Sequence, residues 1–250
     1  MSRPLRIEIP GGLYHVMSRG NERRRIVRDE VDRWKRVDWL RRTVETYGWL
    51  VHAFVIMTNH DHIFLQTPDP NLSAGMQYYN GSYSSYFNRR HRRSGHLFQG
   101  RFKAHIVETE AHYLEVSRYV HLNPVRAALA AKPEDWRWSS YRGYHRASQI
   151  LEWVTYTRVL SEFGRNPVKS RTAYRRFVRA GMDNPLNAPW GDAMHGLIVG
   201  SEAFVDKMRR LLNDEPSDAA VPQLAKLRSQ PSLEQIISTT ADVFKVDEAA

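Results

Sequence analysis

Two histidines separated by one residue, His60 and His62, are the first side chains in this sequence with clear chemical potential. Side chains of a β-strand alternate between its two faces, so both imidazoles would lie on one face with their Cα atoms about 6–7 Å apart. From there they can converge on one divalent cation. The alternative is two half-exposed histidines after a turn, because a chain with 11 histidines contains such pairs by chance.

A tyrosine and an asparagine four residues apart, Tyr119 and Asn123, form the second pair. On a helix they would project from the same face. A tyrosine hydroxyl with a pKa of about 10 is a weak nucleophile by itself, but a metal ion that polarises a target phosphate lowers this demand. The alternative is that Tyr119 packs its ring in the core and Asn123 is an N-cap before Pro124.

The charge distribution favours a polyanion as the partner. Lys and Arg outnumber Asp and Glu by 37 to 27, which gives a net charge of +10 and an isoelectric point near 9.9. Residues 212–250 hold seven acids and three bases, for a net charge of −4, so the first 211 residues carry +14. A body this basic indicates binding to nucleic acid rather than to a membrane, because no basic amphipathic anchor stands out.

What the sequence lacks excludes several kinds of chemistry. It contains no cysteine, which rules out disulfides, thiolate zinc sites and cysteine nucleophiles and suits a reducing cytoplasm. Gly95 and Gly100 have the spacing of a phosphate-binding loop, but Arg101-Phe102 follow where that loop needs Lys and Ser or Thr, so no ATP use is expected. No apolar run reaches the length of a membrane span and no signal peptide is apparent, so we expect a soluble intracellular protein.

The hydrophobic pattern predicts four strands and three helices that position these residues. The expected order is a strand at 13–19, a helix at 29–47 closed by Gly48, strands at 49–57 and 62–67, a helix from 72, a strand at 102–108, and a helix from about 110 to Leu122, where Asn123-Pro124 interrupts it. Two βαβ-type halves in this order predict an α+β fold, with helices packed on a ferredoxin-like antiparallel sheet.

Two of the predicted helices carry an apolar stripe at the spacing that burial requires. The members are Val31, Trp34, Val37, Leu40, Val44 and Tyr47 in the first helix, and Met76, Tyr79, Tyr83 and Phe87 in the second. We interpret the second, aromatic stripe as core packing rather than as a platform for stacking bases.

Five motifs stand out in the first 145 residues. They are YHVMSRGN (14–21), MTNHDHIFLQ (57–66), GHLFQGRFKA (95–104), YVHLNPVRA (119–127) and WRWSSY (136–141). In this order and spacing they resemble the REP-associated tyrosine transposases, which belong to the single-tyrosine HUH nucleases related to insertion-sequence transposases. The likeness covers roughly residues 5–145.

The resemblance implies a metal-dependent endonuclease and strand transferase that acts on single-stranded DNA. His60 and His62 match the two histidines that hold Mg²⁺ or Mn²⁺, Tyr119 matches the nucleophile, and Asn123 matches the polar residue that completes the metal site. Such enzymes form a 5′-phosphotyrosine and leave a free 3′-hydroxyl, so rejoining needs no ATP. The implied partner is a REP-like palindromic hairpin, bound by a monomer or dimer in the bacterial cytoplasm at the nucleoid.

The basic stretch over residues 89–103 contains six Lys or Arg and no acid. Given the resemblance, we expect this basic stretch to bind the phosphates of the hairpin. The alternative is that it is a solvated loop. The expected DNA contacts are Arg89, Arg90, Arg92, Arg93, Arg101 and Lys103. Two other functions stay open: a domesticated hairpin binder without turnover, and an RNA-binding or RNA-cleaving protein that uses the basic sheet.

Asp61 departs from the family pattern, in which the position between the two histidines is usually apolar. Strand alternation points it away from the metal face, toward the core, where an unpaired carboxylate is costly. Three explanations are open: a partly solvated sheet face, a nearby arginine that pairs with Asp61, or a functional variation.

Beyond residue 148 the sequence predicts an extension and an end segment. We expect a nuclease domain over 1–148, a helical basic extension over 149–211, a polar linker over 212–231 and a last segment over 232–250. A capping box at Ser232 begins a helix that resembles the first helix of a DnaA-type helix-turn-helix, with too few residues after it for a recognition helix. This segment is either an inert remnant or an acidic cover that inhibits DNA binding.

Overall fold

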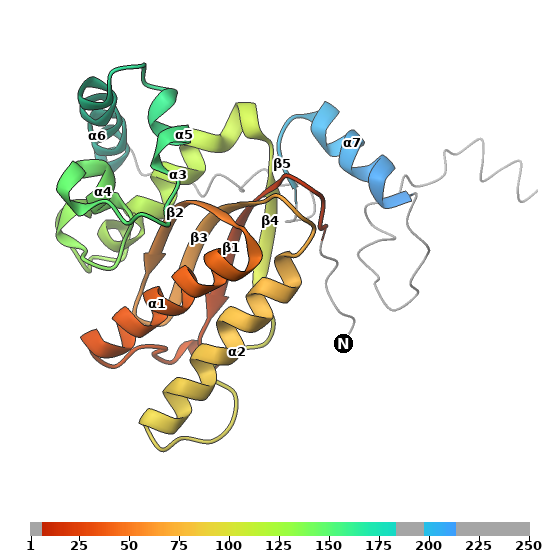
Figure 1. Ribbon diagram of the computed structural model, residues 1–250, viewed down its shortest axis with the longest axis vertical. Coiled ribbons are helices and arrows are strands. Elements are labelled where there is room, and N and C mark those ends of the chain that lie inside the picture. Colours follow the sequence, from red (N-terminus) through yellow and green to blue (C-terminus); the bar gives the residue numbers. More distant parts are fainter. Residues whose placement is uncertain (1–6, 184–197, 214–250) are drawn as a thin grey trace, which may run out of the picture. The chain divides into compact units, whose positions relative to one another are not determined.

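Five strands form the sheet that organises the chain from Glu8 to Ser201 (Figure 1). The structure is a computed structural model, and it describes residues 7–183 and 198–213. The strands are β1 (Gly12–Arg19), β2 (Leu50–Ile56), β3 (His60–Thr67), β4 (Lys103–Val107) and β5 (Ile198–Val199), in the order β2-β3-β1-β4-β5.

The first four strands confirm the predicted α+β, ferredoxin-like arrangement. Neighbouring strands among them are antiparallel. The short strand β5 pairs with β4 in parallel, so the complete sheet is mixed. The sequence does not predict β5, which lies within the stretch expected to be helical, because a strand of two residues leaves no periodic signal.

Helices cover both faces of the sheet. α1 (Glu30–Tyr47) and α2 (Leu72–Arg90) lie side by side across one face, and α3 (Thr109–Arg126) crosses the opposite face (Figure 1). After α3 come α4 (Tyr141–His145), still within residues 1–148, and then α5 (Tyr156–Ser161) and α6 (Pro167–Asp183) of the extension. Single 3-10 turns lie at Asn21–Arg23, Pro133–Asp135 and Ala147–Gln149.

α7 (Glu202–Asn213) belongs to a second compact unit. It is amphipathic, and Val205 and Met208 form its buried side. The predicted linker beyond Asn213 and the predicted helix from Ser232 lie outside the described residues.

α1 ends where the sequence predicts but buries only part of the predicted stripe. Gly48 closes the helix in the left-handed conformation, with φ at +66°. Val31 and Trp34, expected on the buried stripe, are 56% and 42% exposed. The buried face instead includes the fully buried Arg36, which a pattern of apolar residues cannot reveal. The predicted members that are buried are Val37, Leu40 and Val44.

The aromatic stripe of α2 is core, as predicted. Met76, Tyr79, Tyr83 and Phe87 are all completely buried. These rings are therefore closed to a nucleic-acid base and stabilise the packing of α2 on the sheet instead.

α3 continues through Pro124 to Arg126, two residues beyond the predicted interruption at Asn123-Pro124. Pro124 removes one backbone donor in the last turn, where few bonds remain to be lost. The backbone closes after it, since Ala127 N donates to Asn123 O (3.0 Å) and Leu129 N donates to Pro124 O (2.8 Å). Asn123 therefore lies inside a helix and is not an N-cap.

A buried polar cluster ties α3 to the extension. The hydroxyl of Tyr174 on α6 is hydrogen-bonded to His121 Nδ1 (2.7 Å) and to Ser117 Oγ (2.6 Å), both on α3. The other nitrogen of His121, Nε2, lies 2.8 Å from Ser140 Oγ. Burial lowers the pKa of His121 to about 3, so this ring is neutral and holds the cluster by hydrogen bonds alone.

Candidate active site

The sheet face beneath α3 carries the predicted catalytic residues. His60 and His62 point to this face because they alternate with Asp61 along β3. The strand register places Arg19 of β1 directly opposite His60, and His15 lies on the same side of β1. These four residues, His15, Arg19, His60 and His62, are termed the histidine face below.

The predicted histidine pair is close and well held. The ring centroids of His60 and His62 are 5.0 Å apart. His60 Nδ1 donates to Asn59 Oδ1 (2.6 Å), and His62 Nδ1 shares a hydrogen bond with His15 Nε2 (2.8 Å). Because both contacts use Nδ1, the Nε2 atoms of His60 and His62 are the nitrogens left for a metal ion.

Both rings are neutral at physiological pH. Burial lowers the pKa of His60, and the nearby charge of Arg19 lowers it further. Burial also holds the pKa of His62 well below its usual value, with added repulsion from His15 and His60. A metal ligand needs an unprotonated imidazole, so this environment suits metal binding.

Tyr119 of α3 reaches the same place. Its ring centroid lies 5.7 Å from that of His62 and 6.0 Å from that of His15. Burial raises the pKa of the Tyr119 hydroxyl, while the positive charges of Arg126 and Arg19 and a hydrogen bond from the Asn123 side chain act to lower it. The hydroxyl is thus protonated at rest, beside groups that favour its anion.

Asn123 lies one helical turn after Tyr119, on the same side of α3. Its Nδ2 donates to the backbone oxygen of Tyr119 (2.9 Å). Because the nitrogen is used in this way, Oδ1 is the atom of the amide left to approach a metal ion. The structure therefore brings His60, His62 and Tyr119 together, and Asn123 adjoins Tyr119 through this hydrogen bond.

Asp61 is explained by a buried ion pair. Its Oδ2 accepts from Arg36 of α1, at 2.8 Å from Nε and 2.6 Å from Nη2, and neither side chain is exposed. The Tyr79 hydroxyl (3.2 Å) and the backbone N–H of Ser18 (3.1 Å) also donate to this carboxylate. Of the three explanations that the sequence leaves open, the pairing arginine is the correct one.

Arg36 is enclosed by aromatic rings. Its Cζ lies 3.4 Å from the ring centroid of Tyr79, 4.9 Å from that of Tyr83 and 4.8 Å from that of Phe98. Such cation–π contacts partly replace the water that the guanidinium loses on burial. The pair with Asp61 therefore anchors the β3 segment between the two histidines to the opposite helical layer.

The basic stretch contains one arginine that is held by acids. Arg90 pairs with Asp29 (2.8 Å) and with the buried Asp32 (2.5 Å), and His91 also contacts Asp32 (2.8 Å). The N–H groups of Arg90 that make these bonds are not available for phosphate.

The other cations of the stretch differ in their exposure. Arg93 is half-buried, with its Cζ 5.6 Å from the ring centroid of Phe87. Lys103 is the first residue of β4 and lies opposite Met17 of β1. Its side chain is on the same side of the sheet as the histidine face. The exposed members of this set are Arg89, Arg92, Arg101 and Lys103.

Three residues of the site are not identified by the motif pair alone. His15 and Arg19 are four residues apart on β1, a spacing that puts them on one strand face. Arg126 follows Tyr119 by two helical turns, and its Cζ lies 4.9 Å from the Tyr119 ring centroid. These positions can be predicted from sequence periodicity: His15 and Arg19 share one face of a strand, and Arg126 shares one face of a helix with Tyr119.

A metal ion at this site would need ligands of more than one kind. Among the described residues there is no group of three or more His, Cys, Asp or Glu side chains able to hold one. Two imidazoles and one amide oxygen fit a divalent ion only when substrate or water completes its shell.

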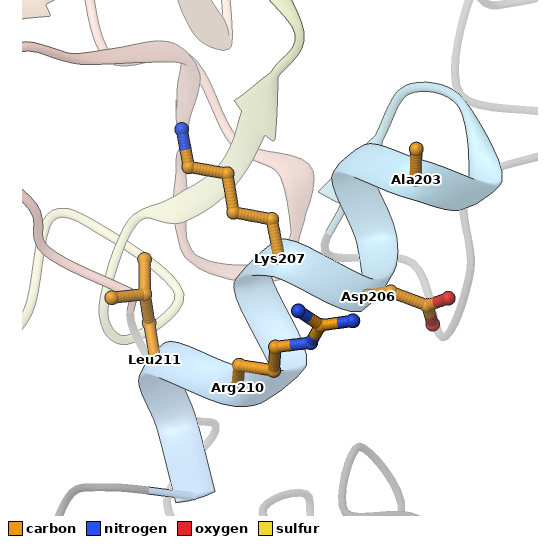
Figure 2. Close-up of a pocket in the computed structure, with 5 residues that line it drawn as sticks. All are labelled: Ala203, Asp206, Lys207, Arg210 and Leu211. Carbon is orange, nitrogen blue, oxygen red and sulfur yellow. The ribbon is translucent and has the colours of Figure 1, made fainter.

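One pocket of the structure lies along α7. Ala203, Asp206, Lys207, Arg210 and Leu211 line it, and Figure 2 shows that all five side chains come from this one helix. None of the five is a histidine, tyrosine, serine or cysteine, so this pocket lacks the kinds of side chain that the candidate site combines in His60, His62 and Tyr119. In the portion of the chain that the structure describes, no helix is long and apolar enough to cross a membrane.

Comparison with known proteins agrees with the geometry. Residues 10–123 match the family model described as an IS200-like transposase. One solved structure, a REP-associated tyrosine transposase bound to a REP hairpin, is similar with a TM-score of 0.51 and 18% identity, over 62% of this chain and 91% of that one. A putative transposase from Deinococcus radiodurans shares 18% identity over 48% of this chain and 94% of that one, with a TM-score of 0.34. A search of curated proteins found no match.

The family model spans β1 to Asn123, and so includes both histidines and the tyrosine of the site. The similar solved structure shares the fold of this segment. Residues 10–123 are therefore similar to the IS200-like transposases over the segment that holds both histidines and the tyrosine of the site.

Proposed function

We propose that this protein is a metal-dependent endonuclease and strand transferase for single-stranded DNA that works through a 5′-phosphotyrosine. One observation carries the proposal: the ring of Tyr119 lies 5.7 Å from that of His62 in the same chain. A tyrosine nucleophile and two metal-binding imidazoles at this separation can act on a single phosphate group.

Tyr119 is the attacking group in this mechanism. Its hydroxyl oxygen bonds to the scissile phosphorus, and the bond from phosphorus to the 3′-oxygen of the preceding nucleotide breaks. The hydroxyl proton passes to solvent, and the departing 3′-oxygen takes up a proton to become a free hydroxyl. Attack by a 3′-hydroxyl on the phosphotyrosine reverses these changes and rejoins a strand without ATP.

His60 and His62 would hold the metal ion through Nε2, with Oδ1 of Asn123 as a third ligand. When bound, Mg²⁺ or Mn²⁺ polarises the phosphate and stabilises the charge that builds on its oxygens. Imidazole is not the preferred ligand of Mg²⁺, so we expect Mn²⁺ to support cleavage at least as well.

The substrate we propose is a REP-like DNA hairpin with a single-stranded flank, encountered in the bacterial cytoplasm at the nucleoid. The similar solved transposase is bound to a REP hairpin. Arg89, Arg92, Arg93, Arg101 and Lys103 would contact its phosphates, and Arg90 would add its charge from within its ion pairs. In this scheme residues 1–148 perform catalysis, 149–211 support them, and 212–231 link them to a segment at 232–250 that adds little.

The test is to incubate the protein with hairpin-bearing single-stranded DNA and Mn²⁺, and to look for a covalent protein–DNA adduct on a denaturing gel. Tyr119→Phe removes one oxygen, so it should abolish the adduct and retain hairpin binding. Tyr144→Phe is the matched control, because this buried tyrosine donates to the backbone oxygen of His52 and lies outside the histidine face. Hairpin binding by the wild type without any adduct would favour a domesticated binder and overturn the proposal, as would cleavage that persists in EDTA.

A further inference from the structure

Arg19 is the last residue of β1 and faces His60 across the strand pair. It is half-buried, on the same sheet face as both histidines. Its backbone is fixed, because Gln99 N donates to Arg19 O (2.9 Å) and the next residue, Gly20, donates to Asn59 O (2.8 Å). The guanidinium therefore extends from a rigid strand end beside the turn that precedes His60.

The described residues supply Arg19 with no anionic partner. Arg36 and Arg90 both pair with buried carboxylates, whereas no ion pair is formed by Arg19 within residues 7–183 and 198–213. Its Nε is buried without a hydrogen-bond acceptor among these residues, and its Nη2 has only the sulfur of Met17 at 3.9 Å. Leaving a charged donor buried and unsatisfied is costly, so a site of this kind is suited to an anion that arrives from outside.

The strand register brings Arg19 to the candidate site. It lies directly opposite His60, and His62 lies on the same face of the neighbouring strand. Its side chain is therefore close to the place where a phosphate would meet nucleophile and metal. In keeping with this position, the charge of Arg19 is among the causes that lower the pKa of His60 and of His62 and act to lower that of Tyr119.

We propose that Arg19 is a catalytic residue that binds a non-bridging oxygen of the scissile phosphate. This inference rests on the proposed function and assigns a role that the histidine–tyrosine motifs do not include. As Tyr119 attacks, negative charge builds on the equatorial oxygens of phosphorus, and the guanidinium donates charge-assisted hydrogen bonds to them. A rigid fork of donors suits this task better than a lysine does.

The experiment measures adduct formation in single turnover at saturating hairpin DNA for the wild type, Arg19→Ala and Arg19→Lys. The control is Arg176→Ala, an exposed arginine of α6 outside the histidine face. Loss of a phosphate donor in the transition state predicts a rate about 100-fold lower for Arg19→Ala, an intermediate rate for Arg19→Lys and no change for the control. Affinity for the hairpin, measured on a Tyr119→Phe background, should fall by less than about tenfold, because one phosphate contact is a small share of the total.

Chemical rescue separates catalysis from folding. Added guanidinium should restore part of the rate of Arg19→Ala, and sodium chloride at equal ionic strength should not. An unchanged rate would overturn the role of Arg19. So would a loss of rate that guanidinium does not restore, if the affinity for the hairpin falls by the same factor. If Arg19→Ala fails to fold, the rate-to-affinity comparison with Arg19→Lys decides the matter. A wild type that forms no adduct would instead overturn the proposed function, and the role of Arg19 with it.

Discussion

The Arg36–Asp61 pair shows how a single residue between two histidines, His60 and His62, can hold both of them in place. Asp61 holds β3 to α1 and α2 from the opposite side of the sheet, through Arg36 and Tyr79. Buried ion pairs contribute little net stability compared with apolar residues of the same size, but removal of one partner leaves a buried charge uncompensated. The acid and the arginine are therefore expected to depend on each other.

Asp61→Asn keeps the shape of the side chain and removes its charge. We expect it to lower the free energy of unfolding by about 3–5 kcal/mol, because Arg36 then lacks a counter-charge. Urea unfolding measures this, and the double variant Arg36→Met, Asp61→Leu should be more stable than Asp61→Asn. Arg137→Met, which breaks an exposed pair with Glu30, is the control and should cost no more than about 1 kcal/mol. A loss for Asp61→Asn no larger than the control's would contradict this account.

Residue patterns identify the four residues proposed to act in catalysis but not the residues that support them. His60 and His62 share a face by strand alternation, and Tyr119 and Asn123 by helix periodicity, so both pairs can be read locally. Arg36 lies 25 residues before Asp61, on a helix where it interrupts an apolar stripe. Only the packing of α1 on the sheet brings this arginine to Asp61. The spacing of residues within one helix or strand cannot predict this contact.

At the scale of elements, α3 is the part whose position matters most for the proposed function, because it carries Tyr119, the proposed nucleophile. It is held from two sides: its sheet-facing side meets the histidine face, and its other contacts include α6 through Tyr174. The extension is thus part of the support for α3 rather than an independent appendage. The elements from β1 to α3 can be predicted from sequence, whereas this contact between α3 and α6 cannot, since Ser117 and Tyr174 are 57 residues apart.

Tyr174→Phe tests this support. It removes the shared partner of His121 and Ser117, leaving two buried polar groups without it, and we expect a loss of about 1–3 kcal/mol in unfolding free energy. Faster amide hydrogen exchange along α3 should accompany the loss. Tyr78→Phe, at a half-buried position of α2, is the matched control and should change neither quantity. Equal behaviour of the two variants would show that the cluster does not hold α3.

Across the whole molecule, several histidines are buried in the neutral form. Burial lowers the pKa of His52 to about 4 and of His121 to about 3, and holds those of His15 and His62 well below their usual value. An unfolded histidine has a pKa of about 6.5. Below that pH the unfolded chain binds protons that the folded chain does not, so the folded state loses stability as pH falls.

We therefore expect the fold to weaken steadily as the pH is lowered from about 7 to about 5, a range in which few carboxylates titrate. Each such histidine contributes at most about 1.4 kcal/mol per pH unit, and the contributions of His52 and His121 level off only near their folded pKa values. Urea midpoints across this range measure the effect. His96→Gln, at an exposed histidine, should leave the slope unchanged. A midpoint independent of pH would contradict the neutral state of these rings.

The placement of Tyr119 against His62 of its own chain has a consequence for the kinetics of the proposed reaction. One polypeptide holds nucleophile and metal ligands together, so the adduct should accumulate at a rate per molecule that does not change on dilution. An equimolar mixture of Tyr119→Phe and His60→Ala chains should stay inactive. Each variant lacks one part of its own site, and the intact tyrosine or histidine of the other chain cannot replace it. The rate of cleavage at a single hairpin should then be first order in the concentration of the protein–hairpin complex.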